Sequence, residues 1–151
     1  MEPVHFYDTT VEWKDSRRGV LSSSVLDSNI EVVTPPEFAG GISGKWSPEH
    51  LLVAAVNSCL MTTFLAIAEN SKLDFISFKS YANGKLEKVD GKFMISEITL
   101  SPTLVLPEGA NRERAERILQ KSEAACLISN SVKATIVFQP HIVAEETAGI
   151  L

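Results

Sequence analysis

The longest apolar segment of the chain, residues 51–68, predicts a helix, because Ser47 and Pro48 before it are good residues to begin one. Glu49 in the first turn suits the positive end of the helix dipole. The segment contains no Asp, Glu, Lys or Arg. A helix that is apolar on every side is normally buried on every side. We therefore expect the rest of the protein to surround this helix.

Alternating apolar and polar positions, with turn residues between them, predict the other elements. Strands are expected over 4–13, 20–24, 29–33, 74–88, 93–106 and 132–139, and a second helix over 111–125. Asp90-Gly91 is a hairpin turn, and the apolar parity changes after Ile95, which predicts a bulge near Ser96-Glu97. The order β-β-β-α-β-β-α-β with short hairpins favours antiparallel sheets and an α+β fold.

The length of 151 residues suits one domain, which we place at residues 1–142, followed by a loose tail over 143–151. Three strands before the long helix and three after it can hardly enclose that helix alone. A homodimer, in which each subunit covers the helix of the other, would complete the burial.

Charge and composition narrow the classes of partner. A net charge of −5 without a Lys/Arg cluster argues against a nucleic-acid or anionic-membrane partner. The apolar segment is long enough to span a membrane, but Asn57, Ser58, Thr62 and Thr63 weaken that interpretation. The first residues do not resemble a signal peptide, and two cysteines cannot form a secreted disulfide framework. We expect a cytoplasmic protein that is not embedded in a membrane.

The candidate chemistry lies at Cys59, in the middle of the long helix. Burial raises the pKa of a thiol, so a cation would have to compensate if this thiol is to react as a thiolate. Arg17 or Arg18 could supply that charge, and Glu49 could be the counter-ion of the arginine. The three histidines are scattered, and no metal site is expected.

Three blocks of sequence carry a resemblance to a known family. They are Ser47-Pro-Glu49, Cys59 ten residues after that glutamate, and the segment from Cys126 to Val132. Together they resemble the OsmC/Ohr family, the osmotically inducible and organic hydroperoxide resistance proteins, over residues 10–139. The resemblance implies an intertwined homodimer whose sheets wrap a long buried central helix, with active sites at the subunit interface.

The resemblance also implies a thiol peroxidase that acts on organic hydroperoxides without metal, flavin or haem. Cys59 would be the peroxidatic thiol, Cys126 the resolving thiol, and Glu49 the carboxylate partner of an arginine. A small dithiol or a lipoylated protein would be the reductant. The Arg-x-Gly turn of the family fits Arg17-Arg-Gly19, with Arg17 favoured and Arg18 as the substitute. Leu127, where the family commonly has proline, indicates a divergent member.

Helix geometry separates two of these residues. Ten helical residues span about 15 Å, so Glu49 cannot touch Cys59 of its own helix. If two copies of the helix cross antiparallel near Ala54-Ala55, Glu49 of one approaches Cys59 of the other. We therefore expect a site that is completed by the second subunit.

Two other functions fit the same residues. A buried cysteine is often no more than a small apolar side chain. The protein could then be a non-catalytic binding protein that uses the interface pocket for a small apolar ligand or thiol compound, or a structural scaffold with two core thiols.

Overall fold

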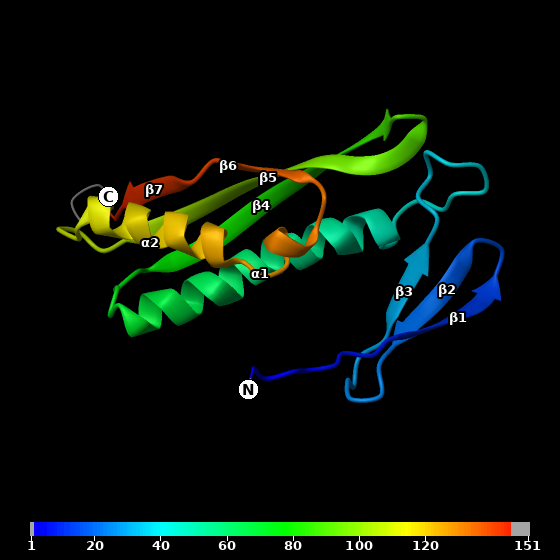
Figure 1. The fold of residues 1–151 in the computed structure, drawn as a ribbon, viewed down its shortest axis with the longest axis horizontal. Coiled ribbons are helices and arrows are strands. Elements are labelled where there is room, and N and C mark those ends of the chain that lie inside the picture. The colour runs from blue at the N-terminus through cyan, green and yellow to red at the C-terminus, as the bar shows by residue number, and fades with distance from the viewer. Residues whose placement is uncertain (1, 146–151) are drawn as a thin grey trace, which may run out of the picture. The chain divides into compact units, whose positions relative to one another are not determined.

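The computed structural model describes residues 2–145, and its elements follow the predicted order with one additional strand (Figure 1). They are β1 Thr10–Asp15, β2 Arg18–Ser22, β3 Ile30–Val33, α1 Pro48–Asn70, β4 Ser77–Val89, β5 Lys92–Leu106, α2 Arg112–Ala125, a 3₁₀ turn Ser129–Ser131, β6 Thr135–Phe138 and β7 His141–Ala144. The chain divides into two units between Leu51 and Leu52, and each is described by itself. The sequence expectation of a single domain stays a prediction.

The first unit contains an antiparallel sheet in the order β1-β2-β3. The first strand begins at Thr10 rather than residue 4, because Thr10 pairs with Ser22, the last residue of β2. The sheet connects directly to the approach to α1. The N–H of Val33 donates to the carbonyl of Trp46 at 2.9 Å, one residue before the cap of that helix.

The second unit is built on the long β4-β5 hairpin. Asp90 and Gly91 form its turn with positive φ angles of 51° and 80°, as the sequence predicted. Lys85 lies opposite Glu97, while Leu86 lies opposite Ile95, so Ser96 is the extra residue of a bulge. The predicted bulge is therefore confirmed.

Two strands of this sheet differ from the expected antiparallel arrangement. Both β6 and β7 pair with β5 in parallel. The chain leaves the end of β5 and returns through α2 to the other end of the sheet, so the next strands run in the same direction as β5. Pro140 separates the two short strands, which lie one after the other along β5. Val143 and Ala144 belong to β7, so the loose tail does not begin at residue 143. The rest of the expected tail, from residue 146, lies outside the described residues.

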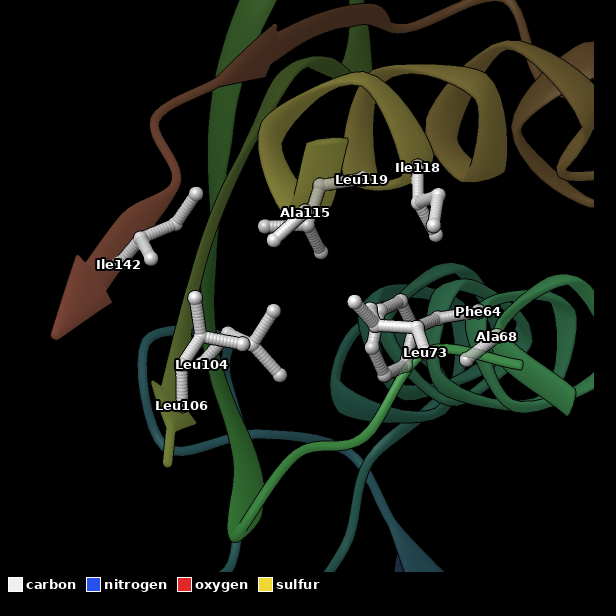
Figure 2. Close-up of a cluster of buried hydrophobic side chains, with 9 residues drawn as sticks. All are labelled: Phe64, Ala68, Leu73, Leu104, Leu106, Ala115, Ile118, Leu119 and Ile142. Carbon is white, nitrogen blue, oxygen red and sulfur yellow. The ribbon is translucent and has the colours of Figure 1, made fainter. Parts of the chain in front are cut away.

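The core of this unit lies between the sheet and the two helices. Alternate residues of β5, from Ile98 to Leu106, are buried on one face. Figure 2 shows Leu104 and Leu106 of β5 facing Phe64 of α1, with side chains of α2 and β7 closing the cluster. A second cluster joins Val56 and Leu60 of α1 to the first half of β5. Both clusters therefore fix α1 against the sheet.

Helix α1 is not buried on every side within one chain, contrary to the prediction. Val56, Cys59, Leu60, Phe64 and Ala68 form its buried face. Apolar side chains elsewhere on the helix remain exposed: Leu52 at 37%, Met61 at 40% and Leu65 at 41%. By length and composition alone the helix could cross a membrane, but the core helix of a soluble protein meets the same criterion.

Candidate active site

The start of α1 has the predicted cap. Ser47 is fully buried, and its Oγ accepts a hydrogen bond from the N–H of His50 at 3.2 Å. The same oxygen lies 2.7 Å from Nδ1 of His50. The carbonyl of Ser47 accepts from the N–H of Leu51 at 2.9 Å, which closes the first turn. The cap thus fixes the backbone of Glu49 in the first helical turn.

The two cysteines meet in the second unit. Cys59 lies on the buried face of α1 with 8% of its surface exposed, and Cys126 follows the last residue of α2 and is fully buried. The thiol of Cys126 lies 3.9 Å from the carbonyl oxygen of Val56, one turn before Cys59. The two side chains interact directly, and neither thiol is in a disulfide. The structure therefore brings together two thiols that are 67 positions apart in the chain.

Their surroundings shift the two pKa values in opposite directions. Burial raises the pKa of Cys59, but hydrogen bonds from the Ile128 N–H, the Cys126 side chain, Thr63 and the Leu127 N–H outweigh it, so the net pKa is lowered. Burial also raises the pKa of Cys126; the side chain and N–H of Ser129 oppose this, while Cys59 adds to it, and the net pKa is raised. Cys59 is therefore the thiol that ionises first.

The groups that lower the pKa of Cys59 within the second unit are neutral. The arginine that the sequence led us to expect beside this thiol stays a prediction. Thr63, one turn along α1, places its Oγ1 3.8 Å from the sulfur. The N–H groups of Leu127 and Ile128 come from the turn after α2. Sequence patterns do not indicate such backbone donors, because every residue except proline has an N–H and only the fold aims it.

The arginines belong to the first unit. Arg17 lies in the turn between β1 and β2, and Arg18 begins β2. Both line an open hollow of about 550 Å³ together with Trp13, Val33 and Pro48. This hollow combines aromatic and aliphatic surface with positive charge.

The two arginines differ in how their charge is used. Arg18 forms ion pairs with Asp15 and with Glu31, the latter at 2.8 Å. Arg17 has no ion pair to any residue that the structure describes, and its side chain lies across Gly40. A Cβ at Gly40 would come within 3.0 Å of Nε of Arg17, and the φ of +77° at this position also favours glycine. Arg17 is therefore the arginine whose guanidinium remains available.

Glu49 carries a buried oxygen without a partner. Its Oε1 is inaccessible to solvent and accepts no hydrogen bond within the described part of the chain. A buried carboxylate oxygen normally has a donor, so this atom marks a position that an additional cation or N–H group could occupy.

Within residues 2–145, no three His, Cys, Asp or Glu side chains are grouped so that they could hold a metal ion. The functional groups that the structure gathers are thus two thiols with their hydrogen-bond donors. The guanidinium of Arg17 and the free oxygen of Glu49 are features of the other unit.

Comparison with known proteins identifies the family. The sequence profile of the family described as OsmC-like protein matches residues 40–141. The uncharacterized protein YmaD of Bacillus subtilis is 26% identical over 144 residues, covering 92% of this chain and 93% of that protein. Peroxiredoxin OsmC of Escherichia coli is 30% identical over 90 residues, covering 60% and 62%.

The fold is shared with solved structures. The crystal structure of an organic hydroperoxide resistance protein from Elizabethkingia anophelis superposes with a TM-score of 0.75 at 20% identity, covering 96% of this chain and 100% of that one. The profile match spans well over half of the chain and includes both cysteines. The chain therefore belongs to the OsmC-like protein family.

Proposed function

We propose that the protein is a thiol peroxidase that reduces organic hydroperoxides. The observation that carries this proposal is the contact between Cys59, whose pKa is lowered, and Cys126, whose pKa is raised. A nucleophilic thiol must be a thiolate, and a resolving thiol must lie beside it. The names of relatives, a peroxiredoxin and an organic hydroperoxide resistance protein, support chemistry of this class.

The first step oxidises Cys59. Its thiolate attacks the outer oxygen of the hydroperoxide; an S–O bond forms and the O–O bond breaks. The sulfur loses two electrons, and the organic alkoxide takes up a proton and leaves as an alcohol. The apolar residues beside Cys59, Val56 and Leu60 among them, favour an organic peroxide over hydrogen peroxide.

The second step uses Cys126. Its sulfur attacks the sulfenic acid of Cys59, an S–S bond forms, and the hydroxyl group leaves as water with the proton of the Cys126 thiol. An external dithiol then reduces this disulfide by thiol–disulfide exchange and becomes a disulfide itself. We propose a small dithiol or a lipoylated protein as this reductant, and the cytoplasm as the location, where such reductants are available.

Arg17 and Glu49 complete the proposed site from the second subunit of a homodimer. Glu49 and Cys59 are about 15 Å apart along one helix, so the two groups must come from different subunits to act together. The exposed apolar side chains of α1, Leu52, Met61 and Leu65, support its use as a subunit interface. In this arrangement the guanidinium of Arg17 stabilises the departing oxyanion, and Glu49 orients the guanidinium.

The hollow beside Arg17 favours one alternative. A volume of about 550 Å³ lies within the range of small-molecule sites. A non-catalytic protein of the same fold could bind an anionic apolar compound there and keep both cysteines as core residues.

Titration of thiols after one equivalent of cumene hydroperoxide separates the two functions. The peroxidase loses both thiols of each chain, and the peroxide is consumed in the same stoichiometry. Cys59→Ser should abolish this loss, whereas Cys126→Ser should still lose its remaining thiol. Two unreacted thiols in the unaltered protein would overturn the peroxidase and favour the binding protein.

A further inference from the structure

Three hydroxyl side chains lie within one turn of Cys59 on α1, and they use their hydrogen bonds differently. Ser58 donates to the carbonyl of Ala54 at 2.7 Å, and Thr62 donates to the carbonyl of Cys59 at 3.1 Å. The Oγ1 of Thr63 instead lies 3.8 Å from the Cys59 sulfur, and in the part of the chain that the structure describes it has no other hydrogen-bond partner. The Thr63 hydroxyl is therefore the one that serves the thiol and not the helix backbone.

The position of Thr63 fixes this contact. Residues four apart on a helix lie on the same face, so Thr63 lies one turn beyond Cys59 on the same side of α1. Its branched side chain has few rotamers in a helix, and it is partly buried. Residues 51–68 carry no Asp, Glu, Lys or Arg, and β5 contributes Ile98 and Leu100 to the adjoining core. The hydroxyl thus meets the sulfur in largely apolar surroundings.

We propose that Thr63 is a catalytic hydrogen-bond donor, whose hydroxyl holds the Cys59 sulfur as a thiolate. A hydroxyl can donate or accept, but a thiolate can only accept, so the hydroxyl must donate once the thiol has lost its proton. A hydrogen bond to a charged acceptor is stronger than one to a neutral acceptor, so the contact favours the thiolate over the thiol. This role rests on the proposed function of Cys59 as the nucleophile, but it can be tested without any peroxide.

The direction of the pKa shift at Cys59 supports this role. Burial raises the pKa, yet the net pKa is lowered, and the Thr63 hydroxyl is among the hydrogen-bonding groups that lower it. The titratable group that faces Cys59 from the end of α2 is Cys126. The proposed homodimer would add the guanidinium of Arg17. A substitution of the threonine leaves both of these groups in place, so it isolates the contribution of the hydroxyl.

The experiment measures alkylation of Cys59 by iodoacetamide against pH, with the modified cysteine identified by peptide mapping. Thr63→Val keeps the branched shape and removes the hydroxyl. On the rising part of the pH profile, where only a fraction of the thiol is ionised, this variant should react several-fold to about tenfold more slowly than the unaltered protein, as expected for loss of a hydrogen bond to a charged group. At high pH the two rates should converge.

Thr62→Val is the matched control, because it removes a hydroxyl from the next residue of the same helix, where the hydroxyl bonds a carbonyl. Its profile should stay close to that of the unaltered protein. An unchanged profile in folded Thr63→Val, or an equal shift in Thr62→Val, would overturn the proposal.

A second pair of variants tests the same hydroxyl without a buried methyl group beside the sulfur. Thr63→Ser and Thr63→Ala differ only by the hydroxyl, and alanine is well tolerated in a helix, so this pair serves even if Thr63→Val does not fold. Thr63→Ser should keep most of the reactivity of Cys59 on the rising part of the profile, and Thr63→Ala should lose it. Identical profiles for the two would contradict the proposal. Because no readout uses peroxide, a failure here is distinguishable from a failure of the proposed peroxidase.

Discussion

At the scale of single residues, the two thiols differ although both are buried. Burial acts on both in the same direction, and the difference comes from the donors that each sulfur meets. Hydrogen bonds to Cys59 outweigh the effect of its burial. Cys126 also has donors, the side chain and N–H of Ser129, but it faces Cys59, whose negative charge disfavours a second thiolate. The places of the two cysteines in the sequence do not by themselves show which thiol ionises more easily and which one resolves.

The opposite pKa shifts predict different pH profiles for alkylation. The rate at each thiol rises as pH increases through its pKa and then levels off, because only the thiolate reacts. Cys59, with a lowered pKa, should therefore level off at a lower pH than Cys126, with a raised pKa. Iodoacetamide labelling with peptide mapping measures both rates in one sample. Faster labelling of Cys126 near neutral pH would contradict the assignment of Cys59 as the nucleophile.

The arginine pair predicts unequal effects of two similar substitutions. Arg17→Ala should lower the rate of peroxide reduction by about 100-fold, the typical cost of losing one donor to a developing oxyanion. Arg18→Ala should retain most of the rate, because the guanidinium of Arg18 already forms ion pairs with Asp15 and Glu31 of the first sheet. Initial rates with cumene hydroperoxide measure both. A larger loss in Arg18→Ala would reverse the roles.

At the scale of elements, the close approach of β4 to α1 depends on one glycine. A Cβ at Gly84 would come within 2.5 Å of Val53 Cγ2. Gly84→Ala should therefore destabilise the protein by about 1–3 kcal/mol, the usual cost of overpacking. Urea denaturation measures the change.

The control is the same substitution in a Val53→Ala background, where the obstructing methyl group is absent. There Gly84→Ala should cost much less, since the effects of contacting residues are not additive. An equal cost in both backgrounds would show that Gly84 serves something other than this contact.

Local sequence signals predicted most elements correctly. The Ser47 cap, the Asp90-Gly91 turn and the bulge at Ser96 depend on a few neighbouring residues, and the structure has all of them. The additional strand β7 was missed because its residues after His141 are all apolar, so that it shows no alternation of apolar and polar positions. The parallel pairing of β6 and β7 depends on the return path through α2, which periodicity does not encode.

The candidate site was predictable to the same degree. Cys59 and Cys126 were found because a thiol in an apolar helix is conspicuous and because the spacing resembles a family. The Leu127 and Ile128 N–H groups and the role of Gly40 beneath Arg17 were not, since backbone direction appears only in the fold. The expectation that α1 is buried on every side was wrong for a single chain. An apolar sequence indicates that a helix is buried, but it does not show whether one chain or two chains bury it.

At the scale of the whole molecule, the proposed homodimer makes a prediction that a monomer cannot satisfy. Cys59→Ser and Glu49→Gln should each be inactive alone. After the two are mixed, unfolded and refolded together, about half of the dimers carry one subunit of each kind, and each has one intact composite site. About a quarter of the wild-type activity should therefore return.

Sites completed within one subunit give the opposite result. Each subunit of the mixed dimer would then carry one defect, and the refolded mixture would stay inactive. Refolding each variant separately, with mixing only afterwards, is the control for gain of activity during refolding.

Non-reducing peptide mapping after one equivalent of cumene hydroperoxide tests the proposed peroxidase most directly. The peptides of Cys59 and Cys126 should be recovered joined by a disulfide, and Cys126→Ser should leave a sulfenic acid on Cys59 that dimedone traps. Recovery of both peptides with free thiols, or oxidation of Cys126 alone, would contradict it.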